Sequence, residues 1–72
     1  MTKEDKLFMR GYIAACSNYY HMHRDDVATR ETLIAGGITT IAKMRSVGVV
    51  QHDIDILKPV IKEISRRKNL IP

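Results

Sequence analysis

The sequence predicts an all-α fold of four helices in one domain spanning residues 1–72, with long first and last helices and two short ones between them. Three observations support this prediction. Apolar residues recur at steps of three and four along the chain, and convincing strand-type alternation is absent. Glycines stand where the short helices would end. A chain of 72 residues is also too short to form a second domain.

The first helix is expected to begin after Thr2 and to end near His23. Thr2 is a suitable N-cap, and Glu4 and Asp5 follow it where the helix dipole favours negative charge. Gly11 costs about 1 kcal/mol relative to alanine inside a helix, which suggests that another helix backbone passes close to it. Two neighbouring apolar rows predict a wide buried face. The first row contains Phe8, Tyr12, Ala15, Cys16 and Tyr19, and the second contains Met9, Ile13, Cys16 and Tyr20.

The second helix is expected to be short. Asp25 or Asp26 would cap its start, because an aspartate side chain accepts the free N–H groups of a first helical turn. The pair Gly36-Gly37 supplies the left-handed residue that commonly stops a helix, and Ile38 suits the apolar contact after such a stop. The residues Val27, Leu33 and Ile34 lie along it, and Arg30 contributes its alkyl stem.

The third helix is expected to be short as well. Thr39 or Thr40 would cap it, and Gly48 would end it. Its apolar residues are Ile41, Met44 and Val47. A DNA-binding helix-turn-helix is not favoured for the second and third helices. When Gly37 is aligned as the turn glycine, Lys43 falls where the motif needs an apolar residue.

The fourth helix is expected to run from about Gln51 to Lys68 and to carry an apolar stripe at helical spacing. The members of this apolar stripe are Val50, Ile54, Leu57, Ile61 and Ile64. Pro59 should kink the helix, because proline inside a helix costs about 3 kcal/mol, yet the apolar spacing stays in phase across it. The alternative is a short helix to Leu57 and a new helix with Pro59 in its first turn.

A homodimer is expected from the number of apolar faces. A chain of this size buries only about 60% of the surface that its unfolded form exposes, and an internal disulfide is excluded because Cys16 is the only cysteine. Part of the apolar stripe is therefore expected to face a second chain. The expected core or interface residues are Phe8, Tyr12, Ile54, Leu57, Ile61 and Ile64.

Catalytic, metal-binding and cofactor-binding motifs are not apparent, so we expect neither an enzyme nor a cofactor. His21 and His23 stand two residues apart near Cys16, a spacing that diverges on a helix and matches no common zinc pattern. Cys16 lies on the apolar side without a Cys-His signature, which favours core packing over a nucleophilic role.

Basic residues cluster in the predicted last helix, and the net charge of the chain is +4. The members of this basic cluster are Lys58, Lys62, Arg66, Arg67 and Lys68. Contacts to an acidic protein surface or to phosphates need such clustering. Basic residues are also favoured in the last turns of a helix, where Glu63 can pair with Arg67. Binding to an acidic protein surface is the preferred hypothesis, and nucleic-acid binding is the alternative.

The location is expected to be cytoplasmic. Residues 2–6 are charged, unlike the start of a signal peptide, and apolar runs stay well short of the roughly 20 residues that a membrane span needs. A single cysteine also fits a reducing compartment. We therefore expect no contact with a membrane.

Two segments carry a resemblance to a class of known proteins. The run from Arg10 to Cys16 (RGYIAAC) and the turn Gly36-Gly37-Ile38-Thr39, with the isoleucine-rich last helix, resemble the short helical accessory proteins of early operons in lambda-like temperate phages. The resemblance implies a non-enzymatic protein in a bacterial host cell. Such a protein would bind a host or phage regulatory protein and modulate host physiology or phage development.

Overall fold

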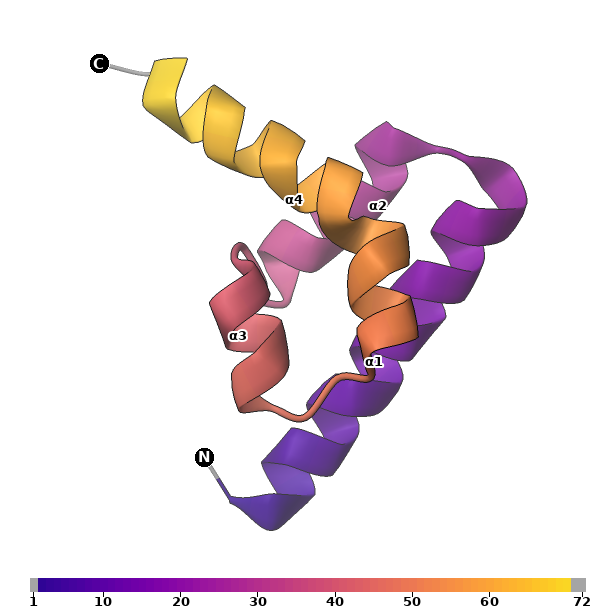
Figure 1. Cartoon of the computed structure of the whole chain (residues 1–72), viewed down its shortest axis with the longest axis vertical. Helices are drawn as coiled ribbons and strands as arrows, with labels where there is room; N and C mark the ends of the chain where they lie inside the picture. The colour runs from indigo at the N-terminus through magenta and orange to yellow at the C-terminus, as the bar shows by residue number, and fades with distance from the viewer. Residues whose placement is uncertain (1, 71–72) are drawn as a thin grey trace.

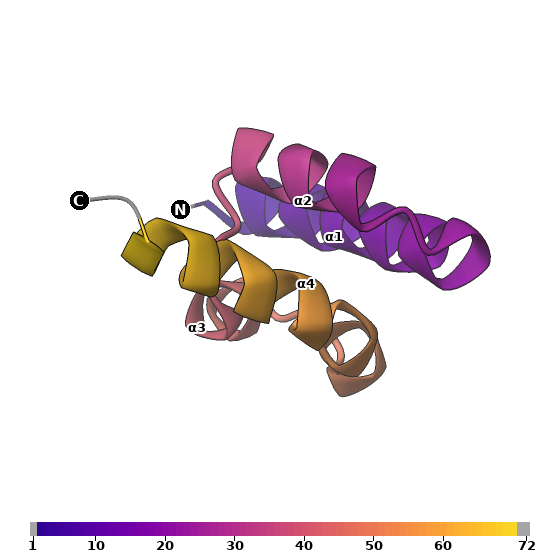
Figure 2. The same ribbon diagram turned by 90° about the horizontal axis from the view of Figure 1, so that it is seen from above.

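Four helices follow one another in the order α1 (Lys3–His23), α2 (Asp26–Ala35), α3 (Ile41–Ser46) and α4 (Gln51–Leu70). The computed structural model describes residues 2–70, with side chains for residues 2–67. Helices α1 and α2 lie side by side in one layer, and α3 and α4 form the second layer (Figures 1 and 2). The all-α prediction, with long first and last helices, is confirmed.

The helix starts follow the predicted caps. The side chains of Thr2, Asp25 and Thr40 each accept the backbone N–H three residues further on, at 3.0–3.1 Å. Each cap therefore satisfies an N–H group that has no partner within its helix. Of the alternatives left open by the sequence, Asp25 caps α2 and Thr40 caps α3.

The ends of the two short helices depend on glycines with positive φ. Gly37 has a φ of 75° and Gly48 a φ of 86°, a region that glycine enters without steric cost. After the first of them, the N–H of Ile38 donates to the carbonyl of Leu33 at 2.8 Å, and the Ile38 side chain is fully buried. The predicted stop at Gly36-Gly37 is therefore confirmed.

Helix α4 is continuous through Pro59, and its axis changes direction along its length (Figure 1). Proline has no N–H to donate to the carbonyl of Asp55, four residues earlier. Both residues are exposed, so water can reach this side of the helix. The prediction of one helix across Pro59 is confirmed, the split alternative is wrong, and the helix ends at Leu70 rather than Lys68.

One core joins all four helices. Its members are Ile13, Cys16, Leu33, Ile38, Met44, Val47, Ile54, Leu57, Val60, Ile61 and Ile64. Four members of the apolar stripe are at most 6% exposed within this single chain, and only Val50 is exposed, at 61%. Ile54, Leu57, Ile61 and Ile64 are thus core residues, unavailable to a second chain. The fold of the chain places α1, α2 and α3 against the apolar stripe. The stripe therefore gives no reason to expect a dimer, and the homodimer stays a prediction.

Two polar contacts that the sequence pattern did not reveal connect distant elements. The Ser17 hydroxyl donates to the Asp53 carboxylate at 2.8 Å, joining α1 to α4, and Ser17 is fully buried. The Arg10 Nε donates to the carbonyl of Val47 at 2.6 Å, joining α1 to the end of α3. No other helix passes close to Gly11, because a Cβ added there would have nothing within 4 Å. The expected close helix approach at Gly11 is therefore wrong.

Candidate functional site

The wide apolar face of α1 is divided between the core and the surface. Ile13 and Cys16 belong to the core, with Met9, Tyr12 and Tyr20 packed against it. The neighbouring row, which contains Phe8, Tyr12, Ala15 and Tyr19, lies on the side toward α2 and remains largely open. Phe8 is 70% exposed and Tyr19 is 41% exposed. One apolar row of the longest helix is thus left without full cover.

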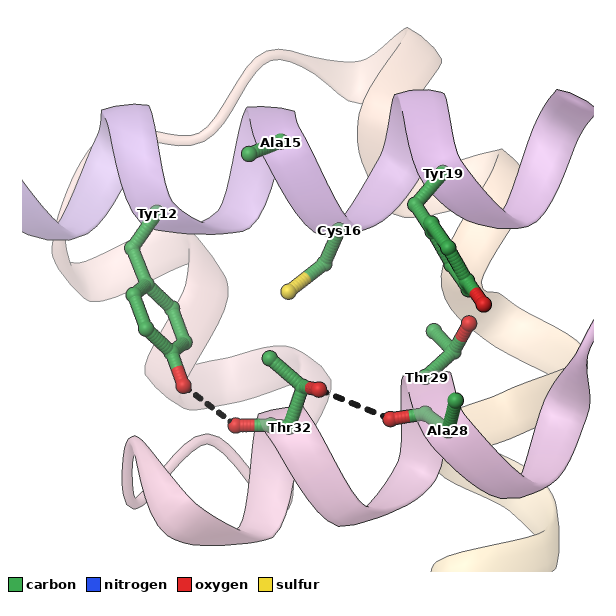
Figure 3. A pocket seen from close by; sticks show the side chains of 7 residues that line it. All are labelled: Tyr12, Ala15, Cys16, Tyr19, Ala28, Thr29 and Thr32. Atoms are coloured by element: carbon green, nitrogen blue, oxygen red, sulfur yellow. Dashed lines mark hydrogen bonds between the residues drawn. The ribbon is translucent and has the colours of Figure 1, made fainter.

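A groove between α1 and α2 borders this open row. The α1–α2 groove has a volume of about 470 Å³ and is lined by Tyr12, Ala15, Cys16, Tyr19, Ala28, Thr29 and Thr32. The Cys16 sulfur points toward α2 from the floor, and the two tyrosines stand on either side of it (Figure 3). The lining contains no Lys, Arg, Asp or Glu side chain. Such a surface suits an apolar group better than an ionic one.

Hydrogen bonds hold the walls of the groove in place. The Tyr12 hydroxyl donates to the carbonyl of Thr32 at 2.5 Å, and the Thr32 hydroxyl donates to the carbonyl of Ala28 at 2.8 Å (Figure 3). The Tyr12 ring also lies against Gly36, where an added Cβ would come within 2.6 Å of it. At the other end, the Tyr19 hydroxyl donates to the Asp25 carboxylate at 3.4 Å. The tyrosine rings are therefore positioned before any partner arrives.

One carboxylate contacts the lining of the groove, since Asp25 accepts from the Tyr19 hydroxyl. Glu4, Asp5 and Glu31 are further exposed carboxylates of α1 and α2. The first two stand one helical turn before Phe8, and Glu31 directly precedes Thr32. The arginines within α1 and α2 point elsewhere, since Arg10 bonds to α3 and Arg30 packs near α4. Asp25 therefore places a negative charge at one end of the α1–α2 groove, although the chain as a whole is basic.

The basic cluster of α4 does not form one continuous surface. Lys58, Lys62 and Arg66 are exposed and recur every four residues, which places them in one row, while Arg67 lies apart from that row. Glu63 accepts from Arg66 at 2.7 Å and from Arg67 at 2.9 Å, which confirms the predicted pairing with Arg67. These two hydrogen bonds lower the pKa of Glu63 to about 2. The side chain of Lys68 lies outside the described residues.

The other polar candidates are placed as follows. His23 stacks against Tyr19, with ring centroids 4.8 Å apart. Within residues 2–67, His, Cys, Asp and Glu side chains form no group of three that could hold a metal ion. Burial raises the pKa of the Cys16 thiol, and this works against the thiolate that a nucleophile needs.

The sequence prediction found part of the groove and missed the rest. Phe8 and Tyr12 were expected at a core or interface, and the structure places them on the open row of α1. The contributions of Ala28, Thr29 and Thr32 were missed, because small and hydroxyl residues on a short helix give no periodic signal.

No protein-family model, curated protein or solved structure matches this chain. None of the described helices is both long and apolar enough to cross a membrane.

Proposed function

We propose that this chain is a non-enzymatic binding protein that holds an amphipathic helix of a regulatory protein in the α1–α2 groove. The observation that carries the proposal is an apolar groove with two positioned tyrosines and no charged lining residue. Laying the apolar face of a helix into such a groove is a recurring mode of peptide recognition. Tyrosine is also enriched among residues that contribute most to protein interfaces.

The length of the open row matches a short helix. Phe8 and Tyr19 are separated along α1 by about 17 Å at 1.5 Å per residue. A partner helix would place about three turns along this distance, with apolar residues at i, i+4, i+7 and i+11. Those side chains would contact Tyr12, Ala15 and Tyr19 on one side and Ala28 on the other.

Exposed carboxylates on α1 and α2 specify the partner further. Because Asp25 lies at one end of the groove and Glu4, Asp5 and Glu31 are exposed on the same two helices, a helix with Lys or Arg beside its apolar residues is the complementary partner. A second copy of this chain is a poor occupant, since a two-fold contact through this face would bring like carboxylates together. A host or phage regulatory protein is the kind of partner that the resemblance to phage accessory proteins implies.

A designed peptide tests the groove directly. The probe is an alanine-based 18-residue helix with leucine at i, i+4, i+7 and i+11 and lysine at the positions that flank each leucine, and its counterpart carries glutamate in place of lysine. Amide chemical shifts of the full chain would be followed during titration. We expect saturable changes in α1 and α2 with the lysine peptide, and at least tenfold weaker binding of the glutamate peptide.

Matched variants separate the groove from other apolar surface. Ala15→Arg places a long cation in the groove and should abolish binding, whereas Val50→Ser alters an apolar residue that is 61% exposed elsewhere and should not. Saturable changes confined to α4, or no change with either peptide, would overturn the proposal. A dimer in sedimentation that Ala15→Arg converts to a monomer would also overturn it, because a second copy would then occupy the groove.

Nucleic-acid binding is the second candidate, favoured by the exposed row Lys58, Lys62 and Arg66. Three phosphate contacts predict a slope of about −2.7 for log affinity against log salt on duplex DNA. Replacing the three residues by glutamine should remove binding that depends on this row. Absence of binding to duplex DNA at low salt would exclude this candidate.

A further inference from the structure

Arg30 is the most buried cation among the described side chains, at 9% exposed. No hydrogen bond or ion pair of its side chain is present within residues 2–67, although a buried arginine normally has an acidic partner. Within that range, each side-chain nitrogen or oxygen of a buried residue either has a hydrogen-bond partner or is accessible to solvent. Each guanidinium nitrogen that lacks a partner therefore keeps some access to solvent.

Arg30 lines a hollow of about 410 Å³ between α2, the α2–α3 turn and the second half of α4. We call it the Arg30 hollow, and its lining residues are Arg30, Ile34, Thr39, Thr40, Ile64, Ser65 and Arg67. Its size falls within the range of about 300 to 1,000 Å³ that is typical of ligand pockets. Two arginines, three hydroxyl groups and two isoleucines form the lining, and it contains no carboxylate.

A second, smaller hollow borders Arg30 on its other side. It measures about 170 Å³ and is lined by Tyr20, Asp26, Arg30, Pro59, Val60 and Glu63. Neither Asp26 nor Glu63 lies within ion-pair distance of Arg30, and Glu63 is already bound to Arg66 and Arg67. An anion would be repelled from this side and would enter the side without carboxylates.

We propose that the Arg30 hollow binds a phosphate monoester that carries a small apolar substituent. Guanidinium groups bind the oxygens of phosphate in a bidentate manner, and Arg30, which is already largely buried, would lose little side-chain entropy in doing so. Arg67 donates its Nε–H to Glu63 at 2.9 Å, which leaves its terminal N–H groups for a second phosphate oxygen.

The hydroxyl groups and the isoleucines decide between phosphate and simpler anions. Thr39, Thr40 and Ser65 add donors beyond what the two oxygens of a carboxylate need, whereas phosphate has three oxygens to satisfy. The Thr40 hydroxyl keeps its proton available, because its oxygen accepts the Lys43 N–H as the cap of α3. Ile34 and Ile64 offer an apolar wall to the ester substituent.

The test is a titration of the full chain with inorganic phosphate, n-butyl phosphate and butyrate at constant ionic strength. Amide shifts of Thr39, Thr40 and Ser65 and the Nε–H signals of Arg30 and Arg67 report on the hollow. We expect saturable shifts with both phosphates, at least threefold tighter binding of butyl phosphate than of inorganic phosphate, and at least tenfold weaker binding of butyrate.

Three variants assign the site. Arg30→Met keeps an apolar stem of similar length and should weaken butyl phosphate binding at least tenfold. Arg67→Gln changes an exposed residue that folding does not need and should weaken it at least threefold. Arg45→Gln removes an equal charge from the exposed surface of α3 and should leave the affinity within twofold of the parent.

Several outcomes would overturn the proposal. Chemical shifts that grow without saturation would indicate non-specific ionic attraction. An equal loss of affinity in Arg45→Gln and Arg67→Gln would indicate the same. Butyrate binding as tight as butyl phosphate would refute the assignment to phosphate. If Arg30→Met does not fold, an unchanged affinity in Arg67→Gln is sufficient to refute the site. None of these results depends on the α1–α2 groove.

Discussion

Replacing Leu57 by alanine tests whether the apolar stripe of α4 serves the core of a single chain. Leu57 is fully buried, whereas Val50 belongs to the same stripe and is 61% exposed. Leu57→Ala and Val50→Ala therefore form a matched pair, the first within α4 and the second directly before its first residue. If the apolar stripe belongs to the core of a single chain, Leu57→Ala should lower the free energy of unfolding strongly, and Val50→Ala should leave it nearly unchanged.

The expected loss follows from the burial of Leu57. Removing about three carbon groups costs about 2.4 kcal/mol in transfer free energy at about 0.8 kcal/mol each. The cavity left behind brings the total to about 2.7 to 5 kcal/mol. A chain of this size has a free energy of unfolding of about 4 to 11 kcal/mol, so Leu57→Ala should be strongly destabilised, and Val50→Ala should lose less than about 0.5 kcal/mol.

Urea denaturation followed by circular dichroism measures both losses. With an m-value of about 1 kcal/mol/M for a small chain, the midpoint of Leu57→Ala should fall by about 3 M or more. Ile61→Val, with an expected loss of about 0.5 to 1.5 kcal/mol, provides a milder variant if Leu57→Ala does not fold. Equal losses in Leu57→Ala and Val50→Ala would refute the reasoning. A midpoint that rises with protein concentration would also refute it, because stability would then depend on association.

Three further predictions follow from single residues. Gly11→Ala should raise the free energy of unfolding by about 1 kcal/mol, because a Cβ there meets nothing; an unchanged or lower thermal midpoint would contradict this. Glu63 has its pKa lowered from 4.5 to about 2, so its carboxylate stabilises the folded chain above pH 4.5, and this contribution is lost as the pH falls toward 2. The stability difference between the parent and Glu63→Gln should therefore shrink over that range and in 1 M salt, and a constant difference would refute the pairing. The Cys16 thiol, 5% exposed, should react with iodoacetamide at pH 8 more slowly than the urea-unfolded chain does, and equal rates would show that burial does not protect it.

Local signals in the sequence were sufficient to predict the helices. Caps such as Thr2 act on N–H groups within the same turn, and glycines such as Gly37 act through their own φ angle, so neither needs a distant partner. The continuity of α4 across Pro59 was also predictable, because Leu57 and Ile61 keep the helical phase on either side of it.

The partner of each apolar face was not predictable in this way. Both rows of α1 have the same spacing, and only the packing of α4 decides that the row of Ile13 is buried while the row of Tyr12 opens onto a groove. The apolar stripe that contains Ile54 and Ile61 likewise has the same spacing whether this chain or a second chain buries it. The unpaired state of Arg30 among the described residues also depends on where Glu63 lies in space.

The sequence by itself thus determined which segments are helical, approximately where each begins and ends, and which rows of residues are apolar. Only the tertiary structure decided which faces meet inside the molecule and which remain as the α1–α2 groove and the Arg30 hollow. The physical reason is that caps, glycine turns and periodicity act over a few residues, whereas burial depends on elements that are distant along the chain.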